Sequence, residues 1–161
     1  MKMSDTPAVS VQTVIEASPD RVYEIVGDLD AMASFGTEFQ GGDWASGRPG
    51  EVGSTFTGRQ RLGESEWETT STVVSATPDK EFAWVVGDVD NATATWTVSL
   101  REVPGGTEVD YAFVHGPGPS GLRDRIAAHP DSESKYIEGR LAMLQENMVK
   151  TLEGIRRRTS R

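Results

Sequence analysis

A run of strand-like segments that ends in one long amphipathic helix is the feature that most constrains how this chain folds. Short β-branched or alternating segments separated by turn residues are typical of antiparallel strands. We predict seven strands, at residues 9–16, 37–44, 54–61, 67–75, 81–86, 93–103 and 107–115. Two short helices are predicted between the first two strands. Ser18 and Pro19 would start the first, and Asp30 would cap the second, which ends at Gly36.

The final helix carries an apolar stripe whose members recur at spacings of three and four residues, the pattern of one helical face. These residues are Ile137, Leu141, Leu144, Met148, Leu152 and Ile155. Such a stripe must be buried, and the apolar face of the sheet is the partner that the chain offers. The sequence therefore predicts an α+β fold in which an antiparallel sheet packs on a long C-terminal helix.

The faces of the sheet follow from pairing residues across two hairpins. When Arg61 is paired with Glu66, and Ala76 with Glu81, the apolar residues of both hairpins fall on one face, because alternate residues of a strand share a face. Extending the pattern gives a predicted inner face that carries Phe56, Gly58, Gln60, Trp67, Thr69, Ser71, Trp84, Trp96, Val98, Tyr111, Phe113 and His115. Charged residues such as Arg59 fall on the opposite face. A bulge at 104–106 would leave the last pairing open.

Composition excludes several classes of function. The chain has 161 residues, which fits one domain, and we predict a flexible N-terminus at 1–8, a domain at 9–156 and a basic tail at 157–161. The net charge of -9 disfavours nucleic acid and anionic membranes as partners. With two His and no Cys, a zinc site is not expected, and no P-loop or dinucleotide fingerprint indicates another cofactor. No signal peptide or membrane span is apparent, so we expect a cytoplasmic monomer or homodimer.

Several local motifs resemble one known family. They are residues 15–23, Val26-Gly27-Asp28, residues 53–61, Trp67, Phe82-Ala83-Trp84, Trp96 and Gly105-Gly106-Thr107. On these motifs the chain resembles the START-like (SRPBCC) superfamily with the helix-grip fold, in particular the polyketide cyclase/dehydrase family. The resemblance implies a curved sheet wrapped around the C-terminal helix, with a hydrophobic cavity between them. Known relatives bind lipids, sterols, polyketides or quinones, and some catalyse polyketide cyclisation.

The inner face and the helix stripe together supply the predicted ligand-binding residues. They are Phe35, Phe56, Gly58, Gln60, Trp67, Thr69, Ser71, Trp84, Trp96, Val98, Phe113, Leu141, Leu144 and Met148. The Trp side chains would either stack on a flat ligand or fill the core, and their small neighbours favour a cavity. Phe35, Phe39 and the loop at 116–121 would form its mouth, although the loop is equally well explained as a connector.

Tyr111 and His115 are the candidate catalytic residues. His115 could exchange protons near neutral pH, or it could be a hydrogen-bonded structural residue at a strand end. Tyr111 could donate a hydrogen bond to a ligand carbonyl, or it could be a core tyrosine with a backbone partner. Gln60 is an unusual polar group for an apolar face. It would either orient a ligand or bond a neighbour across the cavity.

These observations favour binding over any particular reaction. The preferred function is binding of a small hydrophobic ligand, of polyketide, aromatic or lipid-like character, in an internal cavity. One alternative is an aromatase/cyclase or dehydratase in which Tyr111 and His115 manage proton transfer. A second alternative is an interaction module whose outer sheet or helix binds a partner protein.

Overall fold

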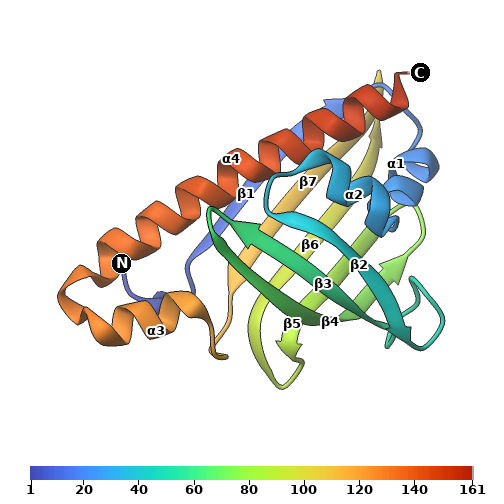
Figure 1. Cartoon of the computed structure of the whole chain (residues 1–161). Helices are drawn as coiled ribbons and strands as arrows, with labels where there is room; N and C mark the ends of the chain where they lie inside the picture. Colours follow the sequence, from blue (N-terminus) through green and yellow to red (C-terminus); the bar gives the residue numbers. More distant parts are fainter. Residues whose placement is uncertain (161) are drawn as a thin grey trace.

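The computed structural model describes residues 1–160 and confirms the predicted fold class (Figure 1). The chain runs through η1 (Met3–Asp5), β1 (Ala8–Ile15), α1 (Pro19–Val26), α2 (Leu29–Phe35), β2 (Phe39–Ser46), β3 (Thr55–Leu62), β4 (Ser65–Thr77), β5 (Glu81–Asp88), β6 (Asn91–Val103), β7 (Gly106–His115), α3 (Gly121–Ala128), η2 (Pro130–Ser132) and α4 (Glu133–Thr159). The strands form one antiparallel sheet in the order β1-β7-β6-β5-β4-β3-β2. Helix α4 crosses this sheet diagonally, with β1 beneath it (Figure 1).

The predicted register is correct for the hairpin of β3 and β4 and for the half of the next hairpin that lies away from its turn. Arg61 pairs with Glu66 as predicted. The predicted partnership of Ala76 with Glu81 is wrong, because Ala76 pairs with Phe82. A bulge at Val74 inserts one extra residue into β4, and beyond it the predicted pairs are restored. The inner face is therefore continuous across both hairpins.

The turn between β6 and β7 is regular. Val103 pairs with Gly106, so the bulge considered at 104–106 does not form. Strand β2 begins at Phe39, two residues after the predicted start, which leaves Thr37 and Glu38 in the connector from α2. This connector lies beside α4 and contributes to the candidate site.

The two short helices begin where capping chemistry allows. Pro19 occupies the first turn of α1 and follows Ser18, as predicted. The predicted cap of α2 is wrong by two residues. The carboxylate of Asp28, not Asp30, accepts a hydrogen bond from the amide of Ala31 at 3.1 Å. Helix α2 therefore begins at Leu29 and ends before Gly36.

Four of the six stripe residues of α4 pack into the main core as predicted, whereas Ile137 and Leu141 lie in a second apolar cluster. Leu144, Met148, Leu152 and Ile155 are buried in one cluster with residues of β4 to β7. The helix continues to Thr159, so the residues predicted as a basic tail from 157 onward are helical as far as Thr159. None of the helices within residues 1–160 combines the length and the apolar character needed to cross a bilayer.

The segment that precedes β1 packs against helices near the other end of α4. Met3 is only 5% exposed and lies in a second apolar cluster with Ile126 and Ile137. The amide of Met3 also donates to the carboxylate of Glu133 at 3.0 Å. These contacts anchor a segment that is predicted from the sequence to be flexible.

Candidate ligand-binding site

The centre of the inner face is a row of aromatic side chains on three neighbouring strands. Trp84 of β5 is paired with Trp96 of β6, and Trp96 is paired with Phe113 of β7. The Trp84 and Trp96 rings stack with centroids 6.0 Å apart and planes inclined by 13°. Phe113 meets Trp96 edge-on at 4.7 Å. We call Trp84, Trp96 and Phe113 the aromatic row.

The structure divides the predicted ligand-binding residues into two groups. The buried group consists of Phe56, Gly58, Ser71, Val98, Phe113, Leu144 and Met148. The remaining residues are at least partly exposed: Phe35, Gln60, Trp67, Thr69, Trp84, Trp96 and Leu141. The indole of Trp67 is among them, at 37% exposure. Aromatic surface therefore remains accessible on the inner face, mainly on β4 to β6.

Trp44 belongs to the same face, which the sequence left undecided. It is paired with Phe56 across β2 and β3, and the two rings meet at 5.2 Å. Phe56 in turn lies 6.5 Å from Trp84. The aromatic surface thus extends from the edge strand β2 to β7.

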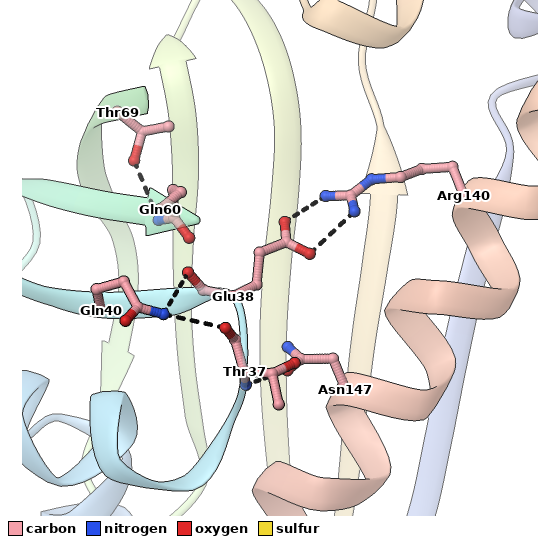
Figure 2. Close-up of polar contacts among 7 residues, drawn as sticks. All are labelled: Thr37, Glu38, Gln40, Gln60, Thr69, Arg140 and Asn147. Atoms are coloured by element: carbon pink, nitrogen blue, oxygen red, sulfur yellow. Dashed lines mark hydrogen bonds and ion pairs between the residues drawn. The ribbon is translucent and has the colours of Figure 1, made fainter. Parts of the chain in front are cut away.

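An ion pair joins the connector before β2 to α4. The guanidinium of Arg140 donates through both terminal nitrogens to the two carboxylate oxygens of Glu38, at 2.9 and 2.5 Å (Figure 2). Both side chains are largely buried, with 20% exposure for Arg140 and 12% for Glu38. Two helical turns further along α4, the Asn147 amide oxygen accepts hydrogen bonds from the amide and hydroxyl of Thr37, at 2.7 and 3.0 Å (Figure 2).

The side chain of Gln60 bonds a neighbouring residue, which is one of the two alternatives predicted for it. Its side-chain nitrogen donates to the hydroxyl of Thr69 across β3 and β4, at the long distance of 3.5 Å (Figure 2). Gln60 is only partly buried, so its amide remains within reach of a molecule lying on the inner face.

Tyr111 and His115 are buried near the Glu38–Arg140 pair. Burial raises the pKa of the Tyr111 hydroxyl far above its ordinary value, and the negative charge of Glu38 adds to the effect. The pKa of His115 is lowered to about 4, first by burial and then by the positive charges of Arg140 and Arg123. At neutral pH Tyr111 is therefore a protonated hydrogen-bond donor, and the His115 imidazole is neutral.

Backbone hydrogen bonds attach the loop after β7 to residues of β6. The amide of Gly116 donates to the carbonyl of Thr93 at 2.9 Å, and the amide of Gly118 donates to that of Ala92 at 2.7 Å. These bonds favour the connector interpretation over a mobile mouth. Phe35 lies near the far end of α4, where its ring packs on Gly154.

Two of the hollows formed by residues 1–160 are open to solvent. One of about 140 Å³ is lined by Thr37, Glu38, Leu62, Met143, Glu146, Asn147 and Lys150. The other, of about 420 Å³, is lined by Asp28, Leu29, Asp30, Gly42, Asp43 and Trp44. Neither is lined by the predicted ligand-binding residues. Within residues 1–160 no group of His, Asp or Glu side chains is arranged to hold a metal ion.

Sequence reasoning did not identify Glu38 and Arg140. One signal was present: Arg140 lies three residues after Ile137 and four before Leu144, so a charged residue interrupts the apolar stripe. A charge in that position needs a buried partner, since an unpaired one is costly. Glu38 lies 102 residues away, and nothing in the local sequence marks it as that partner.

Comparison with solved structures places the fold among known proteins. The solution structure of the Polyketide_cyc-like protein Cgl2372 from Corynebacterium glutamicum has a TM-score of 0.67 and 27% identity, covering 93% of this chain and 89% of that one. The di-domain ARO/CYC StfQ, from the steffimycin biosynthetic pathway, has a TM-score of 0.75 and 12% identity, covering 95% of this chain and 50% of StfQ. Major latex-like protein 151 from Panax ginseng has a TM-score of 0.68 and 13% identity, covering 96% of this chain and 97% of that one.

No curated protein sequence matches this chain. The family model described as polyketide cyclase / dehydrase and lipid transport matches residues 6–149, which include all seven strands and most of α4. The chain therefore belongs to the polyketide cyclase/dehydrase and lipid transport family.

Proposed function

We propose that this protein binds a small hydrophobic ligand of aromatic, polyketide or lipid-like character against the inner face of the sheet. The observation that carries the proposal is the stacked pair of Trp84 and Trp96, which stays partly exposed although it lies on the apolar side of the sheet. Large aromatic side chains on an apolar face are normally covered by the core. Here the surface they leave open suits a flat apolar molecule.

Apolar burial would supply most of the affinity, at about 25 cal/mol for each Å² removed from water. A few polar groups would set the orientation of the ligand. The protonated hydroxyl of Tyr111 suits a carbonyl or hydroxyl acceptor, and the amide of Gln60 offers both a donor and an acceptor. Family membership supports the same class of ligand, because the family includes lipid transport.

Thermal unfolding in the presence of apolar aromatic compounds tests this function. 2-Naphthamide is a suitable probe because it is flat, neutral and about the size of an indole. We expect it to raise the Tm in a concentration-dependent manner, since a ligand that binds only the folded state stabilises it. The shift should survive in Tyr111→Phe and His115→Ala. Absence of a shift with naphthyl, polycyclic and fatty-acyl compounds alike would contradict the proposal.

Cyclisation or dehydration of a polyketide is a second candidate function, favoured by the placement of Tyr111 and His115. Both lie on the inner face of β7, and their pKa values are displaced in opposite directions. A neutral imidazole accepts a proton and a protonated phenol donates a hydrogen bond, which are the two roles that enolate chemistry requires. A cyclase should lose turnover of a synthetic poly-β-ketothioester in Tyr111→Phe and His115→Ala while retaining affinity for it.

A further inference from the structure

Two buried side-chain nitrogens lie unpaired at one end of the inner face. His115 Nε2 and Arg123 Nε are both enclosed, yet neither has a hydrogen-bond partner among residues 1–160. A terminal nitrogen of Arg123 donates to the carbonyl of Gly116 at 2.8 Å, so the guanidinium lies against the residue that follows His115. Unpaired buried polar atoms are rare in folded proteins, and each one calls for an explanation.

The net charge around these two nitrogens is positive. Arg140 is compensated by Glu38, but none of the ion pairs found within residues 1–160 includes Arg123. His115 is itself only 5% exposed. The half-buried guanidinium of Arg123 therefore lies beside a buried imidazole without an ion-pair partner. This region is locally positive, although the net charge of the chain is -9. We call His115 and Arg123 the basic corner.

We propose that the basic corner binds the carboxylate of the ligand while the apolar body of the ligand lies on the aromatic row. This inference rests on the proposed function and deepens it, because it names amphipathic aromatic acids as the ligand class. Arg123 Nε–H donates to one carboxylate oxygen, and His115 donates to the other from Nε2 in the corresponding neutral tautomer. Phe113 connects the aromatic row to the basic corner, since its ring centroid lies 4.7 Å from that of Trp96 and 4.7 Å from that of His115.

A matched pair of ligands separates the carboxylate from the apolar body. 2-Naphthoate and 2-naphthamide share one shape, but only naphthoate carries a charge. By calorimetric titration we expect naphthoate to bind about tenfold tighter or more, the range for hydrogen bonds to a charged group. The preference should disappear in Arg123→Gln, because the affinity for naphthoate should fall to that for naphthamide.

Arg125→Gln is the matched control, because Arg125 is an exposed arginine of the same helix whose guanidinium stacks on Tyr136 at 4.0 Å. It removes the same charge and should keep the preference for naphthoate. Equal affinities for the two ligands in the parent protein would overturn the proposal that the basic corner binds a carboxylate. They would not contradict the proposed function. Failure of both ligands to bind would overturn the basic corner, and failure of the polycyclic and fatty-acyl compounds as well would overturn the proposed function.

The pKa of His115, measured by NMR, gives a second test of the basic corner. The chain contains two histidines, so His129→Gln leaves His115 as the single imidazole in an NMR titration. The charged groups that act on His115 are Arg123 of α3 and Arg140 of α4, and both lower its pKa. A bound carboxylate opposes them, so saturating naphthoate should raise the pKa of His115 whereas naphthamide should not. An unchanged pKa with naphthoate bound would overturn the proposal.

Discussion

Glu38 and Arg140, 102 residues apart in the sequence, form a largely buried bidentate ion pair that fastens the connector before β2 to helix α4. The hydrogen bonds from Thr37 to Asn147 hold the same connector two turns further along the helix. This attachment holds the edge strand β2, and with it Trp44, against the rest of the inner face.

Removing one partner of this ion pair should destabilise the fold. Glu38→Gln leaves the Arg140 guanidinium largely buried without a counter-charge, and we expect a loss of about 3 kcal/mol in the free energy of unfolding. The double variant Glu38→Gln/Arg140→Met should lose less than the single one, because no uncompensated charge remains. Chemical denaturation measures both. Glu51→Gln is the control: its pair with Arg48 is exposed, at 60% and 80%, so the loss should stay below about 1 kcal/mol. Equal losses for Glu38→Gln and Glu51→Gln would contradict this account.

Two glycines of α4 should respond to alanine in opposite directions. A Cβ at Gly154 would lie 2.4 Å from the ring of Phe35, so Gly154→Ala should destabilise the protein by about 1–3 kcal/mol. A Cβ at Gly139 meets nothing within 4 Å, and Gly139→Ala should stabilise by up to about 1 kcal/mol through helix propensity. Thermal unfolding distinguishes the two. A stabilised Gly154→Ala variant would show that Phe35 does not pack there.

The stability of the fold should fall in acid because of His115. Its pKa is about 4 in the folded protein against an ordinary value of 6.5, so between these values the unfolded chain binds the proton and the folded one does not. The contribution of the neutral imidazole is therefore complete above pH 6.5 and is lost as the pH falls toward 4, by up to about 3 kcal/mol. In His115→Leu this loss should be absent. Parallel pH profiles of unfolding free energy for the parent and the variant would disprove it.

Adjacent residues of β4 distinguish the two faces of the sheet. Thr69 pairs with Gly58 on the inner face, whereas Thr70 points to the opposite face and is exposed. Thr69→Phe should weaken the binding of 2-naphthamide by roughly fivefold to a hundredfold, the range for overfilling a packed site. Thr70→Phe should leave the affinity unchanged. Equal affinities of the two variants in calorimetric titration would place the ligand elsewhere.

The sheet and its inner face could be predicted from the sequence because local rules determine them. Turn residues and alternating apolar residues set the pairing of Arg61 with Glu66, and the face of Trp67 follows from it. The bulge at Val74 could not be predicted, because Val73 and Val74 are both apolar and β-branched. The alternation of apolar and polar residues therefore does not show which of the two faces the core. The cap of α2 was misplaced for a similar reason, since Asp28 and Asp30 are chemically equivalent candidates.

The polar part of the site could not be predicted, because it depends on contacts between segments far apart in the chain. Glu38 and Arg140 are 102 residues apart, and the packing of the connector on α4 brings them together. Phe35, predicted at the mouth of a cavity, packs instead on Gly154, and only the three-dimensional path of α2 decides between these places. Likewise, the unpaired Nε2 of His115 is a property of its surroundings that no sequence pattern encodes.

The indole signals of Trp44, Trp67, Trp84 and Trp96 in a ¹⁵N-resolved NMR titration with 2-naphthamide test the central claim most directly. If the ligand lies on the inner face, the signals of Trp84 and Trp96 should shift most and saturate with one common dissociation constant. A titration in which those two indoles stay unmoved, while amides of the outer face shift or no signal responds, would contradict it.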